Sequence, residues 1–190
     1  EGKVAFDVYY WPTNGYESVT VEIASNDVAI TGRVEYASDG GEGFATNAKL
    51  IIPADYELTA PAGYKWVALG EDKQVLEAIT YVAQIGEVKY ETLAEAVAAV
   101  TEGGKVELLV DASGNGIVVP SGTNFTLDLG GFTYTVDGDT VGSPGTETNG
   151  FQLLRDSNIT IQNGKITTDK AKILIQNYSN LTLDNVDLVG

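Results

Sequence analysis

Apolar and polar residues alternate through the C-terminal half of the chain, and one short phrase occurs there three times. Asn-apolar-Thr-apolar lies at 124–127, 158–161 and 180–183. The last two copies begin 22 residues apart, at 158 and 180, and the match extends over 151–168 against 173–190. Alternation predicts strands with one buried face. A repeat of this length is typical of a solenoid, in which each repeat adds one coil.

The alternating segments predict strands in about three successive coils. The first coil is expected to contain 106–110, 116–119, 125–129 and 132–136, the second 151–154, 159–162 and 165–167, and the third 173–176, 181–184 and 186–188. The first two copies of the phrase are 34 residues apart, so the surplus predicts a loop over 137–150. Inserts on a solenoid often carry its binding face, which makes this loop a candidate partner contact.

The hydrophobic period changes just before the repeats and predicts one short helix over 93–102. Thr92 and Glu95 have the spacing of a capping box, in which each side chain bonds the backbone N–H of the other residue. Leu93 and Val97 follow at helical spacing, and Gly103-Gly104 is expected to end the helix. We expect this helix to cover the open end of the first coil.

Residues 1–80 have a different pattern, with short alternating segments separated by Pro, Gly and Asn turns. Strands are expected at 4–11, 18–23, 28–36, 49–52 and 64–69. This spacing is typical of a β-sandwich-like module. The sequence therefore predicts two parts, a β-rich module over 1–80 and a capping helix with coils over 81–190.

The second part resembles bacterial surface proteins, adhesin-like in character, that carry right-handed, pectin-lyase-like parallel β-helices. The resemblance lies in four segments, 83–86, 90–97, 104–109 and 128–133. It implies that the short helix seals the N-terminal end of the coils. The expected fold is mainly β, with an N-terminal β-sandwich-like module, one capping α-helix and a short right-handed parallel β-helix.

Composition narrows the possible partners. The chain has 27 acidic and 11 basic residues, a net charge of −16, so it lacks the basic face that nucleic acids and anionic lipids require. Cysteine and histidine are absent, which excludes disulfides, thiol nucleophiles and metal sites built on these residues. No apolar run is long enough to span a bilayer, so no membrane insertion is expected.

Two groups of residues are candidates for ligand binding. Asp137 and Asp139 offer the carboxylate oxygens that calcium prefers, although acidic turns of this kind are also common in solvated loops. No other cofactor is expected. An aromatic cluster near the N-terminus could stack on a sugar or a partner protein, or could belong to a core strand; its members are Tyr9, Tyr10, Trp11 and Tyr16.

Four Asn residues match the N-glycosylation motif, namely Asn124, Asn158, Asn177 and Asn180. Three of them coincide with the repeated phrase. In stacked coils aligned Asn side chains can bond one another, so we interpret these three as a structural ladder.

The function predicted from these observations is non-enzymatic. A lyase-type site would need a calcium-binding acidic cluster facing a base, and the only arginines are Arg33, in the other part, and Arg155, beside Asp156 in a turn. We expect an extracellular, cell-surface bacterial protein, adhesin-like or structural, whose partner is a host or bacterial surface glycan or protein. The alternatives are a polysaccharide lyase or hydrolase remnant and a phage fibre module.

The last predicted coil, 173–188, would leave an apolar stack end and an unpaired strand edge. Native chains rarely leave such an edge exposed, because it recruits other strands. Either the chain is part of a longer parent with further coils, or the end pairs with another subunit in head-to-tail homo-assembly.

Overall fold

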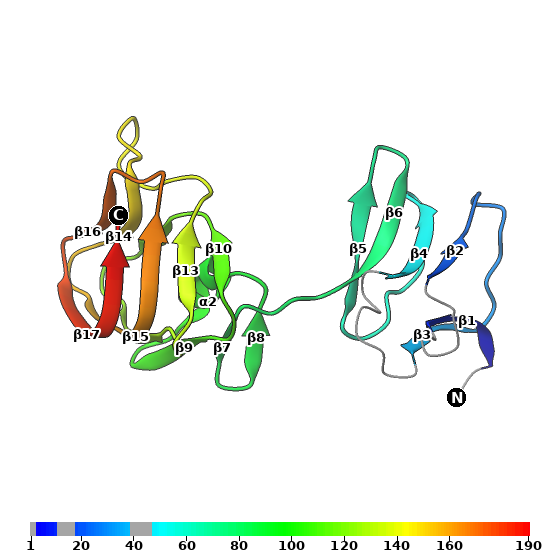
Figure 1. Cartoon of the computed structure of the whole chain (residues 1–190), viewed down its shortest axis with the longest axis horizontal. Helices are drawn as coiled ribbons and strands as arrows, with labels where there is room; N and C mark the ends of the chain where they lie inside the picture. The colour runs from blue at the N-terminus through cyan, green and yellow to red at the C-terminus, as the bar shows by residue number, and fades with distance from the viewer. Residues whose placement is uncertain (1–2, 11–17, 39–46) are drawn as a thin grey trace. The chain divides into compact units, whose positions relative to one another are not determined.

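The computed structural model describes residues 3–10, 18–38 and 47–190. Contacts within the chain divide it into two compact units, Glu1–Ile79 and Thr80–Gly190 (Figure 1). Both units are built mainly from strands, as the alternating pattern predicts. Each unit has its own hydrophobic core.

The N-terminal unit consists of two small sheets around one core. The first sheet pairs β1 (Val4–Tyr10) with β3 (Arg33–Ser38) in parallel. The second has the order β2 (Val19–Glu22), β4 (Ala48–Pro53), β6 (Lys73–Ala78) and β5 (Tyr64–Leu69). Val8 of β1 and Leu50 and Ile52 of β4 are buried in the same cluster, so both sheets contribute to the core.

Two strands of this unit differ from the sequence prediction. The strand expected over 28–36 begins only at Arg33. β6 was not predicted, because its Lys, Gln, Leu, Glu and Ala residues are good helix formers. It forms a strand because it pairs antiparallel with β5 along its whole length and buries Leu76 in the core.

The C-terminal unit begins with an antiparallel hairpin and the predicted helix. β7 (Ala83–Ile85) pairs with β8 (Val88–Tyr90) and with the first strand of the repeats. Helix α2 (Leu93–Ala99) starts at the predicted capping box, in which Thr92 and Glu95 bond each other's backbone N–H. It is shorter at its C-terminal end than the predicted 93–102, because Val100 is already extended and packs against the core. No helix in the described part of the chain is long and apolar enough to cross a membrane.

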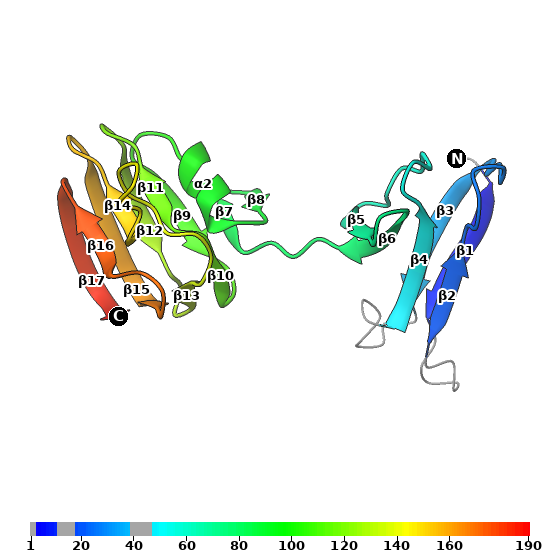
Figure 2. The same cartoon turned by 90° about the horizontal axis from the view of Figure 1, so that it is seen from above.

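The remaining strands pair in parallel and recur in the same order along the chain (Figure 2). One ladder contains β9 (Gly104–Leu108), β12 (Asn124–Asp128) and the first halves of β15 (Asn158–Thr168) and β17 (Asn180–Val189). A second contains β10 (Ala112–Gly114), β13 (Thr133–Val136) and the second halves of β15 and β17. A third contains β11 (Ile117–Val119), β14 (Asn149–Leu153) and β16 (Ile173–Asn177). Each turn of the chain adds one strand to each ladder.

The strands are distributed among successive turns of the stack differently from the coils that the sequence predicts. β12 and β13 belong to the second turn, because Lys105 of β9 pairs with Thr126 and Ala112 of β10 pairs with Tyr134. The 22-residue register holds between β15 and β17, where Asn158 pairs with Asn180. In the third ladder, however, Phe151 pairs with Ile175 rather than with Ile173. The connection after β16 is two residues shorter than the one after β14, which restores the register.

Between β13 and β14 the chain forms the insert that the spacing predicts, shown as the projecting yellow segment in Figure 1. Its base is attached to the stack: the Gly116 N–H donates to the Asp139 carbonyl at 2.7 Å, and Val141 forms a bridge with Asn149. Residues 143–147 are exposed. This tip is therefore accessible to a partner, as the sequence analysis expects of the whole loop, whereas the backbone at the base of the loop is engaged by the stack.

Val97 on α2 provides a test of the capping role. Its side chain is 3% exposed and lies in the same core cluster as the first strands of the repeats. We expect Val97→Asp to lower the free energy of unfolding by about 3 kcal/mol or more, because it buries an unpaired charge. The neighbouring Ala98 is exposed, so Ala98→Asp is the matched control and should cost less than about 1 kcal/mol. Equal thermal stability of the two variants would contradict a capping role for the buried face of α2.

Candidate functional site

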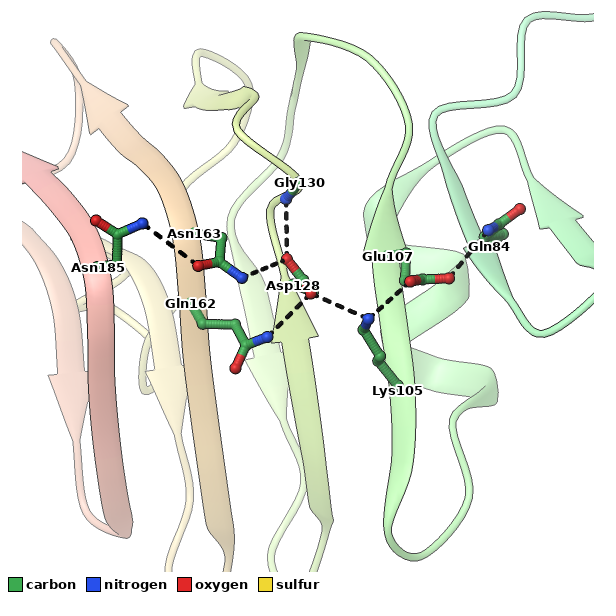
Figure 3. A network of polar contacts seen from close by, with 8 residues as sticks. All are labelled: Gln84, Lys105, Glu107, Asp128, Gly130, Gln162, Asn163 and Asn185. Carbon is green, nitrogen blue, oxygen red and sulfur yellow. Dashed lines mark hydrogen bonds and ion pairs between the residues drawn. The ribbon is translucent and has the colours of Figure 1, made fainter.

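A row of polar side chains crosses the outer face of the larger sheet of the C-terminal unit, which contains β7 to β10, β12, β13, β15 and β17 (Figure 3). The backbone register pairs Gln84 with Glu107, Glu107 with Asp128, Asp128 with Gln162, and Gln162 with Asp184. These residues come from β7, β9, β12, β15 and β17, so five strands each contribute one side chain. We call this set the polar row.

Strand alternation places the polar row on the outside. On β9, Val106 and Leu108 are buried on either side of Glu107, and on β12 Leu127 is buried next to Asp128. Successive side chains of a strand point to opposite faces, so Glu107 and Asp128 lie on the face away from the core. In-register pairing then brings the outward residues of neighbouring strands together.

Asp128 lies at the centre of the row and is bonded from four directions. Its Oδ1 accepts hydrogen bonds from the Gly130 N–H at 3.0 Å and from Asn163 Nδ2 at 3.2 Å. Its Oδ2 accepts from Gln162 Nε2 at 2.9 Å and contacts Lys105 Nζ at 3.0 Å. The side chain is only 13% exposed. Both carboxylate oxygens are therefore occupied by groups of the protein itself.

These contacts control the protonation of Asp128. Burial by itself would raise the pKa of its carboxyl group, but the hydrogen bonds from Gln162, Lys105, Gly130 and Asn163 favour the charged form more strongly. Together they lower the pKa from 3.8 to about 2. Asp128 is consequently a weak base, which suits a structural acceptor better than a group that takes up protons in a reaction.

Lys105 joins the two acids of the row. Its ammonium lies 2.7 Å from Glu107 Oε1 and 3.0 Å from Asp128 Oδ2, while Gln84 Nε2 donates to the other Glu107 oxygen at 3.0 Å. The bond to Glu107, followed by that to Asp128, raises the pKa of Lys105. The bonds from Lys105 and then Gln84 lower the pKa of Glu107. Lys105 therefore stays protonated between two carboxylates.

Asparagine side chains are also aligned across neighbouring strands, in two asparagine ladders. Asn158 Nδ2 donates to Asn124 Oδ1 at 2.8 Å, and Asn180 Nδ2 donates to Asn158 Oδ1 at 2.9 Å. Asn185 Nδ2 likewise donates to Asn163 Oδ1 at 3.4 Å. The structural interpretation of the three repeated glycosylation motifs is thus confirmed for the contacts it requires.

Asn177, the fourth member of the motif set, lies outside these ladders. Its Oδ1 accepts from the N–H and the hydroxyl of Ser179, and its Nδ2 donates to the Ser179 carbonyl. These bonds close a local turn between β16 and β17, as Asn side chains commonly do.

A hollow of about 640 Å³ opens next to the Asn163–Asn185 contact and spans β13, β15 and β17. Its lining includes Thr133, Asn163, Lys165, Asn185 and Asp187. Thr133, Lys165 and Asp187 are paired across β13, β15 and β17, so they form a second outward row of a hydroxyl, an ammonium and a carboxylate. Such a lining can exchange hydrogen bonds with a polar, uncharged ligand.

The calcium candidates lie in the insert, and both Asp137 and Asp139 are exposed. Their backbone atoms are engaged: Lys170 Nζ donates to the Asp137 carbonyl, and the Asp139 N–H donates to Asn115 Oδ1 at 2.8 Å. Among the described residues no group of three or more acidic side chains is placed to hold a metal ion. The described part of the chain therefore brings no third acid to Asp137 and Asp139.

The aromatic cluster is described only in part. Tyr9 lies on β1 and is exposed, and Tyr10 is the last residue of the same strand. Trp11 and Tyr16 lie outside the described residues. The cluster therefore stays a prediction from the sequence.

Sequence reasoning missed the polar row, although a signal for it existed. Asp128, Gln162 and Asp184 each lie four residues after an Asn of the repeated phrase, so the same alignment that relates Asn124, Asn158 and Asn180 relates them. The Lys105–Glu107 end could not be found this way, because β9 lacks the Asn and its register is set by pairing with β12.

Comparison with known proteins returned no relative of this chain. No protein-family model matches it, and neither the curated proteins nor the solved structures contain a match. Its function is therefore inferred from the geometry of its own residues.

Asp128→Asn tests the structural role of the row through its pH dependence. The carboxylate has a folded pKa of about 2, below its ordinary value, so its stabilisation is fully present above about pH 4 and is lost as the pH falls through 2. A shift of this size corresponds to about 2 kcal/mol. We expect the variant to lose about that much free energy of unfolding at about pH 7, and much less at about pH 2.5, in denaturant titrations. The exposed Asp156 is the control, and Asp156→Asn should change little. An equal loss for Asp128→Asn at both pH values would show that the charge does not contribute.

Proposed function

We propose that this chain is a non-enzymatic extracellular protein of a bacterial surface, adhesin-like or structural. In this proposal the C-terminal unit is a short right-handed parallel β-helix capped by α2, and the N-terminal unit is a β-sandwich-like module. Three parallel ladders that each gain one strand per turn support the β-helix. Crossovers between parallel strands are almost always right-handed, which supports the handedness.

The observation that carries the non-enzymatic part is the four-fold bonding of Asp128. On an outer face built for chemistry, the perturbed acid should be accessible to a substrate and its pKa should lie near the working pH. Asp128 instead has a pKa near 2, and its oxygens accept from Gly130, Gln162, Asn163 and Lys105. Polar side chains that bond one another across successive strands stabilise the stacked turns. A stable stack of this kind suits a protein that is held at a cell surface.

The cationic residues favour the same proposal over a polysaccharide lyase or hydrolase remnant. A lyase-type site needs an arginine or lysine beside an acidic cluster. Arg33 forms an ion pair with Glu35 in the N-terminal unit, and Arg155 lies 3.9 Å from Asp156 in an exposed turn. Lys105 does face two acids, but its raised pKa keeps it protonated, so it is a poor base. No particular observation favours a phage fibre module.

We propose that the hollow across β13, β15 and β17 binds the partner, and that this partner is a surface glycan. Thr133, Lys165, Asn185 and Asp187 supply donors and acceptors of the kind that bind sugar hydroxyls. The hollow is formed between outward side chains of parallel strands, and so suits a chain of sugars better than a small buried molecule.

Binding and degradation assays on the same glycans test the proposal. We expect the protein to retain one class of surface glycan on an array and to release no new reducing ends or unsaturated sugars from it. Replacing both Lys165 and Asp187 by Ala should weaken binding by about a hundredfold or more, because two charge-assisted hydrogen bonds are lost. The exposed Lys172 does not line the hollow, and Lys172→Ala is the matched control. Degradation of any bound glycan would contradict the proposal, as would binding that the double variant leaves unchanged.

A further inference from the structure

Two edge strands of the larger sheet of the C-terminal unit, β8 and β17, run in the same direction. In the part of the chain that the structure describes, β10, which pairs with β13 alone, is a third edge strand of this sheet. Among the described residues β8 pairs with β7 alone and β17 with β15 alone within this sheet. β17, β15, β12 and β9 are mutually parallel, β7 is antiparallel to β9, and β8 is antiparallel to β7. β8 is therefore parallel to β17. A copy of the sheet placed beside itself without rotation would add β8 to β17 as a parallel strand.

The polar row carries opposite charges at these two edges. Lys89 on β8 pairs with Gln84, which extends the row beyond β7. The complete row then runs from Lys89 at one edge to Asp184 at the other, and every neighbouring pair is in register. Lys89 is exposed and lies 5.9 Å from the ring centre of Tyr81, and Asp184 is exposed as well. The positive charge of Lys89 at one edge is therefore complementary to the negative charge of Asp184 at the other.

Apolar side chains accompany the charges at both edges. Val88 precedes Lys89 and is 58% exposed, and Leu183 precedes Asp184 and is 46% exposed. Leu183 pairs with the buried Ile161, so it continues an inward, apolar row that nothing described covers. Because both strands run in the same direction, alignment of Lys89 with Asp184 also aligns Val88 with Leu183.

The partner that fits this edge is a second copy of the chain. We propose that copies associate head to tail, with β8 of one copy added in parallel to β17 of the other, Lys89 beside Asp184 and Val88 beside Leu183. The strand edge and the apolar contact supply attraction, and the ion pair sets the register. Lys105 shows within one chain that a lysine can bond an acid across neighbouring parallel strands, since its ammonium contacts Asp128 diagonally on the next strand at 3.0 Å. The interface is heterologous, so it leads to open chains of copies rather than to a closed dimer.

The cap and the net charge set the conditions for this association. Next to β8, α2 exposes the small side chains of Ala94, Ala98 and Ala99, which leave room for an approaching strand edge. Each copy has a net charge of −16, so copies repel one another at long range. Salt near the physiological concentration shortens this repulsion to about 8 Å, which makes it the appropriate condition for the measurement.

Charge exchange across the interface tests the proposal in solution. We expect the mass measured by sedimentation of the full chain to rise with concentration. Lys89→Glu and Asp184→Lys should each weaken association roughly threefold to tenfold. The double variant, with both exchanges in one chain, should regain it, because the opposite charges are restored with the signs reversed. Lys49→Glu and Asp55→Lys change the net charge equally at other exposed positions and are the controls.

The outcomes separate the possible occupants of the edge. A strict monomer at the highest concentration overturns the proposal. A discrete dimer whose association is unchanged by Lys89→Glu also overturns the proposal, because such a dimer indicates two β17 strands facing each other. Circular dichroism of each variant shows that a lost association does not reflect lost folding.

A cysteine pair gives a second, independent measurement, because the chain contains no cysteine. In the Val88→Cys, Leu183→Cys double variant, oxidation should link copies into a series of oligomers whose yield rises with concentration. The control pairs Val88→Cys with Val118→Cys, since Val118 is exposed on β11 in a different ladder. Equal crosslinking of the two pairs would overturn the proposed contact.

Discussion

The architecture of the C-terminal unit depends on in-register parallel pairing between successive turns of the chain. Each strand lies against its counterpart from the previous turn, so apolar side chains lie beside apolar ones on the inner face and polar side chains beside polar ones on the outer face. Phe125 pairs with Ile159 and Ile159 with Leu181 on the inner face, while Asn124, Asn158 and Asn180 are aligned on the outer face. A shift by one residue would move the apolar set outward and break the amide contacts together. Burial and hydrogen bonding therefore specify the same register.

This constraint also decides what the outer face can do. Polar groups that are aligned strand by strand become hydrogen-bond partners, and these bonds can favour the charged form of a carboxylate. The four bonds to Asp128 are an example, since they stabilise its charged form and lower its pKa. Lys105 has a particular value in a chain with so few basic residues, because one ammonium compensates two carboxylates that the register forces together.

Much of the fold could be predicted from the sequence, for physical reasons that differ between elements. The Asn-apolar-Thr-apolar phrase predicts the β15–β17 register because strand period and repeat length agree. The start of α2 could be predicted because the capping box is local. Its end could not, because Val100 leaves the helix to pack against the core, which depends on distant residues.

The misses arise where partners far apart in sequence decide the outcome. β6 consists mostly of helix-forming residues and becomes a strand through its pairing with β5 and β4. The pairing of Phe151 with Ile175 depends on the lengths of two connections, and alignment of residues without gaps cannot detect this. The polar row was missed for a related reason: Lys105, Glu107 and Gln84 lie on strands that lack the repeated phrase, so only the three-dimensional pairing relates them to Asp128.

The stack has a direction, and its two ends are chemically different. In both ladders each Asn side chain donates to the Asn of the preceding turn, so the oxygens of Asn180 and Asn185 face the side where no described strand follows. Asp184 and Asp187 add carboxylates to the same strand. The β17 edge is therefore rich in acceptors, and a strand that joins it must supply donors. At the opposite edge the antiparallel hairpin and α2 close the core while exposing Lys89, a donor. Because each turn donates hydrogen bonds to the turn before it, one edge of the stack is rich in acceptors and the other presents a donor. The two edges are thus complementary to each other rather than to themselves, which favours head-to-tail contact over a symmetric one.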